Sequence, residues 1–198
     1  MSSDTPEWRD GWWRCATRRF SPNADARALG SEITLVVLHH ISLPAGQFGG
    51  DAVIDFFENR LDAVRYAGAV ETDSPAALAS LVALVALAEV RVSAHFFVRR
   101  TGEIVQFVSG DDRAWHAGVS AWRGRSGCND FSLGVEIEGD ALTAFTDAQY
   151  AALDALLDAL KANYPIKAVT THSEIAPGRK IDPGPTFDWS RLGSRWHC

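Results

Sequence analysis

The stretch that decides the fold is Ile33-Thr34-Leu35-Val36-Val37-Leu38-His39-His40. Its first six residues form a short apolar run rich in β-branched side chains, which is typical of a strand covered on both faces. The run ends directly at two histidines. Because strand ends are rigid and lie at the sheet edge where α/β proteins usually place their sites, we expect a buried strand over 33–38 that carries a histidine to a functional edge.

Four later segments also have the composition of strands. Two of them flank a turn at Thr101-Gly102 and therefore predict a hairpin. The last segment runs straight into Thr171-His172, as the first runs into His39. The four segments are Val92–Arg99, Glu103–Val108, Phe131–Ile137 and Ile166–Thr170.

The clearest helix is predicted over residues 146–163. Thr146 and Gln149 have the spacing of a capping box, leucines recur on one face, and Pro165 ends the pattern. A helix with one apolar face must pack against another element. We therefore expect this helix to cover one face of the sheet.

Two less regular segments complete the predicted fold. The Ala/Leu/Val-rich segment 74–90 predicts a buried or half-buried helix with a proline in its first turn. The tail 176–189 is dense in proline and glycine and predicts an ordered loop. Together the elements predict a single α/β domain with a mixed central sheet flanked by helices.

The composition restricts the kinds of partner. The chain has 198 residues, 25 acidic and 19 basic side chains, and a formal net charge of −6, which argues against a nucleic-acid binder. Its polar N-terminus lacks the pattern of a secretory signal, and the apolar stretch 76–88 is too short to span a bilayer. Cys15, Cys128 and Cys198 show no C-x-x-C spacing, which favours reduced thiols. We expect a cytoplasmic protein without a membrane partner.

Two histidines and one aspartate form the candidate metal site. His39 and His172 lie at strand ends, and Asp182 follows in a proline-rich loop. Two imidazoles and one carboxylate are a ligand set of open catalytic zinc sites, which keep a position for water. Each histidine also fits a structural, hydrogen-bonded role. Neighbouring side chains on a strand point to opposite faces, so we favour His39 as the ligand and keep His40 as the alternative.

Hydrolysis of an amide also needs a general base and a cation near the oxyanion. Glu136 lies in an apolar strand on the same face as Glu138. Burying a carboxylate there costs free energy of folding unless the group is paired with a cation or takes part in catalysis. Lys180 precedes Asp182 by two residues, which places it near any metal held there. The alternatives are a salt bridge from Glu136 to a helix and a solvated Lys180.

Four residues are candidates for binding substrate. Trp115-His116 precedes small residues and fits a groove for a sugar or peptide, although the tryptophan also fits a core position below a loop. Arg91 and Arg125 are candidates for holding substrate carboxylates, with an ordinary surface role as the alternative.

Several motifs occur in one order along nearly the whole chain, from about Gly11 to Trp189. They are Val36–Pro44, Gln47–Gly50, Arg91–His95, Gly102–Val108, Arg113–Gly118, Cys128–Ser132, His172–Pro177, Arg179–Pro185 and Phe187–Trp189. This series resembles the zinc N-acetylmuramoyl-L-alanine amidases of the amidase_2 group, which are related to peptidoglycan-recognition proteins. Within that group it is most similar to the cytoplasmic AmpD type, which acts on 1,6-anhydro-N-acetylmuramoyl-L-alanine during cell-wall recycling.

The resemblance implies a role for each matching residue. His39, His172 and Asp182 match the ligands of one zinc ion per chain, Glu136 matches the carboxylate that activates water, and Lys180 matches the lysine that stabilises the oxyanion. Related secreted and phage amidases usually carry cysteine at the position of Asp182, so aspartate there points to the cytoplasmic branch. The resemblance also implies that losing the activity lets anhydromuropeptides accumulate and induces β-lactamase.

The sequence departs from the family at three places. His40 occupies a position where related proteins usually have asparagine. Gly127 occupies a position where some related proteins have an arginine that binds peptide, and whether Arg125 replaces that arginine is open. The segment 62–89 is less similar and is a candidate for a variable lid.

We expect residues 1–198 to form a single catalytic domain, with a core of about 11–189, that acts as a monomer on an anhydromuropeptide. Two other classes are weighed against this hypothesis. One is a recognition module that binds muropeptides without cutting them, and it is disfavoured by the complete ligand set. The other is a lytic amidase that acts on the intact wall, for which no wall-binding repeat is visible.

Overall fold

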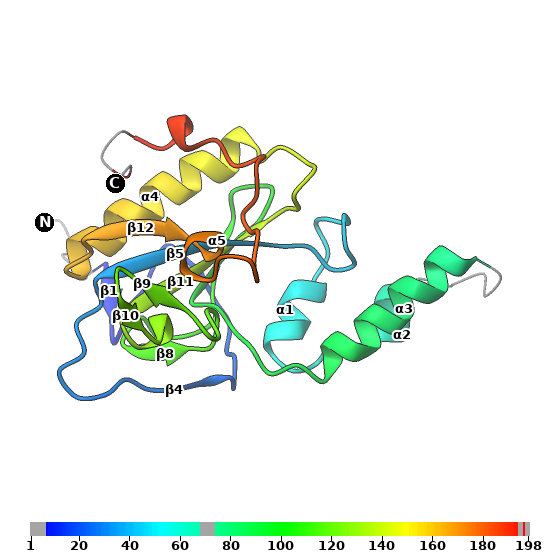
Figure 1. Ribbon diagram of the computed structural model, residues 1–198, viewed down its shortest axis with the longest axis horizontal. Coiled ribbons are helices and arrows are strands. Elements are labelled where there is room, and N and C mark those ends of the chain that lie inside the picture. The colour runs from blue at the N-terminus through cyan, green and yellow to red at the C-terminus, as the bar shows by residue number, and fades with distance from the viewer. Residues whose placement is uncertain (1–6, 68–73, 194–195, 197–198) are drawn as a thin grey trace, which may run out of the picture.

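A computed structural model describes residues 7–67, 74–193 and 196, and its centre is a six-stranded mixed sheet (Figure 1). The strand order is β12-β5-β11-β6-β7-β3. These strands span Ala168–Thr171, Leu35–Ile41, Ser132–Glu138, Phe96–Val98, Ile104–Gln106 and Thr17–Arg18, respectively. β5 is parallel to both of its neighbours, whereas β6 and β7 form the predicted antiparallel hairpin. The predicted α/β class, with a mixed sheet flanked by helices, is confirmed.

The strand quoted first, β5, lies in the interior of the sheet. Residues 35–38 are at most 1% exposed because both faces and both edges of the strand are covered. The strand is longer than predicted, since its pairing with β11 continues through His39 opposite Glu136 and ends with Ile41 opposite Glu138. Tertiary pairing therefore keeps the two histidines inside the strand.

The long helix α4, Asp147–Asn163, covers one face of the sheet (Figure 1). The predicted capping box is present, because Thr146 Oγ1 accepts a hydrogen bond from the backbone of Gln149 while the Gln149 side chain accepts one from the backbone of Thr146. The leucines of the helix are buried against β5, β6 and β11. The prediction for this helix is confirmed to within one residue.

The opposite face is covered by short elements. α1, Ala52–Phe57, packs its phenylalanines against Phe97 and Phe107. On the same face α5, His172–Ile175, directly follows β12 and packs Ile175 against Leu35. The remaining short elements are β1 Trp8–Arg9, β2 Trp12–Trp13, β4 Ala24–Ala26, β8 Asp112–Ala114, β9 Ala121–Trp122, β10 Arg125–Ser126, η1 Cys128–Asp130 and η2 Trp189–Arg191.

The helix expected over 74–90 exists as α3, Pro75–Ala88, but the prediction that it is buried or half-buried along its length is wrong. α3 packs beside α2, Ala63–Ala67, and the pair projects from the body (Figure 1). Only Leu84 is buried, whereas Val82 remains 61% exposed. The helix is apolar on all sides, so its composition does not indicate which side meets the body.

The predicted loop 176–189 contains no helix or strand up to Asp188, and its last residue, Trp189, begins the 3-10 helix η2. Some expectations fall on residues 1–6, 68–73 and 198, which lie outside the described part of the chain. Among the described residues, no helix is both long enough and apolar enough to cross a membrane.

Candidate active site

Three side chains from distant parts of the sequence meet at one end of the central strands. His39 comes from β5, His172 opens α5, and Asp182 lies in the following loop, where its carbonyl accepts a hydrogen bond from the Ser173 backbone. His39 Nδ1 lies 2.9 Å from His172 Nδ1 and 3.2 Å from Asp182 Oδ2, and the third side of the triangle is 2.9 Å. The structure therefore brings together the three residues predicted to hold a metal.

The chemistry of this triangle fits a cation. His172 Nε2 lies 3.2 Å from the carbonyl oxygen of Ala117, which can only accept a hydrogen bond, so Nε2 carries the proton and Nδ1 presents a lone pair to the triangle. In a tetrahedral zinc site, ligand atoms about 2.0–2.1 Å from the ion lie roughly 3.3 Å apart. The observed sides of 2.9–3.2 Å are close to that value.

The protonation states of His39 and Asp182 also fit a metal site. Burial lowers the pKa of His39 to about 4, although the Asp182 carboxylate opposes the shift, so the imidazole is neutral at pH 7. Burial alone would raise the pKa of Asp182, but its interactions with the adjacent His172 and His39 imidazoles hold it well below its usual range. Neutral imidazoles and an ionised carboxylate are the forms that bind a metal.

His40 lies outside the triangle. Its Nδ1 is 3.0 Å from the carbonyl oxygen of Pro183, and its side chain belongs to the opposite face of β5. The geometry favours His39 over His40, and the assignment of the metal ligand stays a prediction.

Glu136 faces the same cavity as the triangle. It lies opposite His39 in the register of β11 and β5, and its Oε2 is buried without a hydrogen-bond partner among the described residues. Burial raises the pKa of the Glu136 carboxyl well above its ordinary value, the Asp182 charge raises it further, and Lys180 opposes the rise. Within the described chain no salt bridge from Glu136 to a helix is found.

The cavity above these groups has a volume of about 340 Å³. Lys180 lies on its exposed rim, and the far wall is apolar. Sequence reasoning did not identify the apolar wall, because its members come from α1 and from the end of α3. These residues are Phe56, Phe57, Leu87 and Val90.

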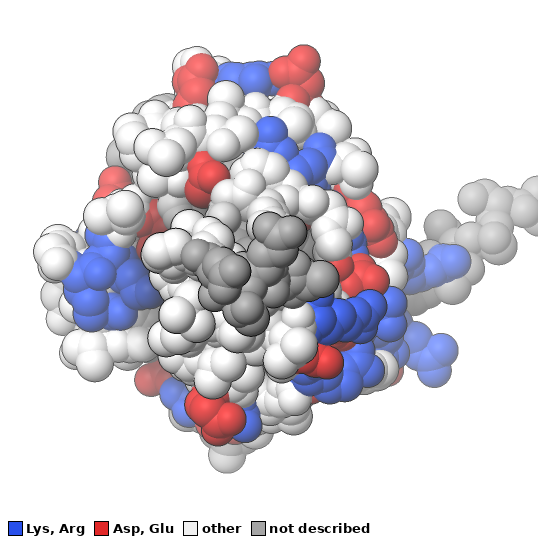
Figure 2. All heavy atoms as spheres, turned by 90° about the vertical axis from the view of Figure 1, so that its right-hand side faces the viewer, with Lys and Arg blue, Asp and Glu red and all other residues white. Residues whose placement is uncertain are grey.

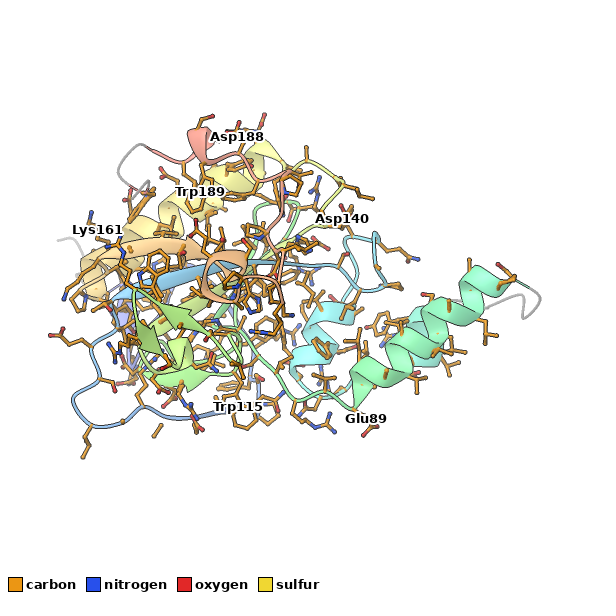
Figure 3. All side chains as sticks on the ribbon, viewed as in Figure 1. Glu89, Trp115, Asp140, Lys161, Asp188 and Trp189 are labelled. Carbon is orange, nitrogen blue, oxygen red and sulfur yellow. The ribbon has the colours of Figure 1, made fainter. Side chains whose placement is uncertain are left out.

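Three of the four candidate substrate residues, Trp115, Arg91 and His116, line an adjoining cavity of about 260 Å³. Trp115 and Arg91 lie in its wall, and it shares His116, His172 and Lys180 with the first cavity. Figure 3 shows Trp115 along the same lower side of the molecule as Glu89, at the end of α3. These residues could therefore contact a ligand that extends from the metal site.

Arg125 lies outside both cavities, and His116 differs from Trp115 and Arg91 because it is buried. Arg125 is exposed on β10, with its guanidinium carbon 3.9 Å from the centre of the Phe131 ring, and it lines neither cavity. His116 is buried, and its Nδ1 lies 3.0 Å from His39 Nε2. Arg179, which sequence reasoning passed over, lines the second cavity and donates hydrogen bonds to the carbonyls of Ala117 and Val119. Its position next to Lys180 was the available signal.

The surface charge does not form a single basic face in the view of Figure 2, where basic and acidic side chains both lie around the face that carries the α2–α3 pair. The chemistry of the chain is concentrated in the two adjoining cavities. A mixed sheet whose edge carries an open three-ligand site, a buried carboxyl and a lysine is typical of metal-assisted hydrolases, and this is the class that fold and site define.

Comparison with known proteins narrows that class. The sequence model of the Amidase_2 family, described as N-acetylmuramoyl-L-alanine amidase, matches residues 29–185. The chain belongs to this family of N-acetylmuramoyl-L-alanine amidases.

Relatives and solved structures agree with the family assignment. The chain is 46% identical over 185 residues to the 1,6-anhydro-N-acetylmuramyl-L-alanine amidase AmpD of Citrobacter freundii, covering 92% of this chain and 91% of the relative. A crystal structure of a selenomethionine AmpD derivative superimposes with a TM-score of 0.84 at 43% identity, over 96% of this chain and 98% of that chain. The Escherichia coli amidase AmiD, solved with anhydro-N-acetylmuramic acid-L-Ala-D-γ-Glu-L-Lys, gives a TM-score of 0.56 at 30% identity, over 85% and 60% of the two chains.

Proposed function

We propose that this chain is a zinc-dependent amidase that hydrolyses the bond between 1,6-anhydro-N-acetylmuramic acid and the L-alanine of a muropeptide. The observation that carries the proposal is the convergence of three lone-pair atoms, His39 Nδ1, His172 Nδ1 and Asp182 Oδ2, within 3.2 Å of one another beside the buried Glu136. The AmpD relatives, which are named for this activity, support the substrate.

Each group has a separate task in this mechanism. Zinc held by His39, His172 and Asp182 supplies Lewis acidity and lowers the pKa of water toward 7. Glu136 accepts the proton of the attacking water and returns a proton to the leaving amine of L-alanine. The Lys180 ammonium stabilises the negative charge that develops on the former carbonyl oxygen.

The second cavity offers groups that suit either half of the substrate. The scissile amide must lie at the ligand triangle, so the sugar or the stem peptide extends from it into this cavity. Trp115 offers a flat apolar face for a sugar ring, and Arg91 and Arg179 offer guanidinium groups for carboxylates of the peptide. Arg125 is the least favoured of the candidate binding residues because it lies outside both cavities.

We further propose that residues 1–198 act as one catalytic domain, with a core of about 11–189, as a monomer in the cytoplasm, where wall fragments are recycled. Free thiols at Cys15 and Cys128 support a reducing compartment. A recognition module without activity is disfavoured, since Glu136 and Lys180 accompany the complete ligand set. Sequence resemblance implies the link to β-lactamase induction.

The test incubates the purified zinc-loaded protein with a soluble anhydromuropeptide, with and without a chelator, and identifies the products by mass spectrometry. We expect release of the free peptide and of anhydro-N-acetylmuramic acid, lost with chelator and restored by added zinc. A parallel turbidity assay on intact sacculi separates this function from that of a lytic amidase. Clearing of sacculi without cleavage of the soluble substrate would overturn the proposal.

A further inference from the structure

His116 is buried directly behind the candidate ligand His39, with its ring at 85° to the His39 ring. His39 Nε2 lies 3.0 Å from His116 Nδ1. A metal-binding histidine almost always donates its second ring N–H to a neighbour, and that bond decides which nitrogen faces the metal. The direction of the bond between the two histidines therefore decides whether His39 Nδ1 presents a lone pair.

The direction follows from the groups beyond His116. Ser132 Oγ lies 2.5 Å from the carbonyl oxygen of Cys128, so its proton is donated there because a carbonyl can only accept. Ser132 Oγ then accepts from His116 Nε2, which lies at 3.2 Å. His116 therefore carries its proton on Nε2 and keeps a lone pair on Nδ1, which accepts from His39 Nε2–H.

The position of His116 is fixed on several sides. Its backbone N–H donates to Asn129 Oδ1, and its ring lies against Gly134, where an added Cβ would come within 2.4 Å of the ring. Ser132 is itself held, because Arg27 donates a hydrogen bond to its backbone carbonyl. Both Ser132 and Cys128 are fully buried, so water does not compete for these bonds.

We propose that His116 is a positioning residue that holds His39 with the lone pair of Nδ1 directed at the metal. It acts through three hydrogen bonds, which run from His39 Nε2–H to His116 Nδ1, from His116 Nε2–H to Ser132 Oγ, and from Ser132 O–H to the carbonyl oxygen of Cys128. The inference rests on the proposed function, since it concerns the same site. It replaces the expectation of substrate contact for His116 with a role through His39, and it adds a role for Ser132, a motif residue to which the sequence analysis assigned none.

The experiment compares four variants with the wild type. His116→Leu removes the acceptor, His116→Asn returns an acceptor oxygen near the position of Nδ1, and Ser132→Ala removes the outer link. Tyr164→Phe is the control, because it removes a part-buried hydroxyl that bonds Asp111 away from the site. Zinc affinity is measured by competition with a chromophoric chelator, and thermal unfolding is measured on the metal-free proteins.

We expect His116→Leu to bind zinc about 10–100-fold more weakly, with a smaller loss for Ser132→Ala, a partial recovery for His116→Asn and no change for Tyr164→Phe. Nitrogen-15 NMR of the metal-free wild type should show the proton of His39 on Nε2. Wild-type zinc affinity in His116→Leu, with only a lower unfolding midpoint, would overturn the inference, as would a proton on His39 Nδ1. A wild type that binds no zinc would instead overturn the proposed metal, and the NMR tautomer would still decide the role of His116.

Discussion

At the scale of single residues, Glu136 has an environment that opposes its charge. Its pKa is raised well above the ordinary value, first by burial and then by Asp182. A carboxyl whose pKa is higher in the folded than in the unfolded protein binds protons more tightly when folded, so the free energy of unfolding falls as the pH rises through that interval. A raised pKa also suits a group that must accept and return a proton near neutral pH.

This pKa shift predicts a stabilising substitution. Glu136→Gln removes the charge, so the metal-free variant should unfold at a higher temperature than the metal-free wild type at pH 8, by roughly 2–4 °C for each kcal/mol relieved. The difference should vanish well below pH 4, where the wild-type carboxyl is protonated in both states because the pKa of an unfolded glutamate is about 4.3. Differential scanning calorimetry across this pH range provides the measurement.

Glu138 supplies the matched control on the same face of the same strand. Its carboxylate accepts hydrogen bonds from the backbone N–H groups of Gly49 and Arg100. Glu138→Gln should therefore lower the unfolding temperature at pH 8, opposite in sign to Glu136→Gln. Equal effects of the two substitutions would contradict the interpretation of Glu136.

The ligand triangle and the general base predict two separable losses. Asp182→Ala should lose bound zinc, whereas Glu136→Ala should keep one zinc ion per chain and lose about 10²–10⁴-fold in kcat. Elemental analysis and the soluble-substrate assay, applied to the same preparations, measure both quantities. Normal turnover by the Glu136→Ala protein would contradict the proposed general base.

At the scale of elements, the two longest helices differ in how they begin. The Thr146 side chain caps α4 and also donates to the carbonyl of Arg100, whereas Ser74 precedes α3 without a side-chain capping bond. Thr146→Ala should lower the free energy of unfolding by about 1–2 kcal/mol, and Ser74→Ala should change it by less than about 0.5 kcal/mol. Urea denaturation of the two variants tests the difference, and equal costs would contradict it.

β11 contains a glycine because a ring lies against it. A Cβ at Gly134 would lie 2.4 Å from the His116 ring, whereas a Cβ at Gly50 would meet open space. Gly134→Ala should destabilise the protein by about 1–3 kcal/mol and weaken zinc binding, and Gly50→Ala should do neither. Chelator competition and urea denaturation measure the two effects. Unchanged zinc affinity in a folded Gly134→Ala protein would show that the His116 ring can shift without consequence.

Local sequence was sufficient for the elements whose own pattern decides them. The β6–β7 hairpin and α4 were predicted because turn residues, a capping box and a leucine stripe act over a few positions. The continuation of β5 through His39 was not predicted, because it depends on pairing with β11, which follows nearly 100 residues later in the sequence. Among site residues, the ligand triangle followed from strand ends and from resemblance. Ser132 and the wall from α1 could not be foreseen, because only tertiary contacts bring them to the site.

At the scale of the whole molecule, both helices of the α2–α3 pair contact α1, through buried Ala63 and the Tyr66–Asp55 hydrogen bond of α2 and through one side of α3. Leu84 is 2% exposed within the cluster that includes α1, and Leu87 from the same helix lines the first cavity. The end of α3 borders the site, whereas most of the α2–α3 pair lies away from it. The expected role of residues 62–89 as a lid therefore stays a prediction.

Leu84, the one buried residue of α3, predicts local opening of this helix. Leu84→Ala should cost about 2–5 kcal/mol in the attachment of α3, whereas Val82→Ala, on the exposed side, should cost little. Hydrogen exchange should show faster exchange in α3 and unchanged protection in β5 and α4 for the Leu84 variant. Uniform loss of protection across the sheet would contradict a separately attached α2–α3 pair.

The order of the sheet has a consequence for the growing chain on the ribosome. β5 emerges early, but both strands that flank it, β11 and β12, are made much later, and Asp182 follows them. Until then the apolar strand β5 has unpaired edges. The proposed metal site would accordingly be completed late in biosynthesis, because a product truncated before Asp182 lacks one of its three proposed ligands.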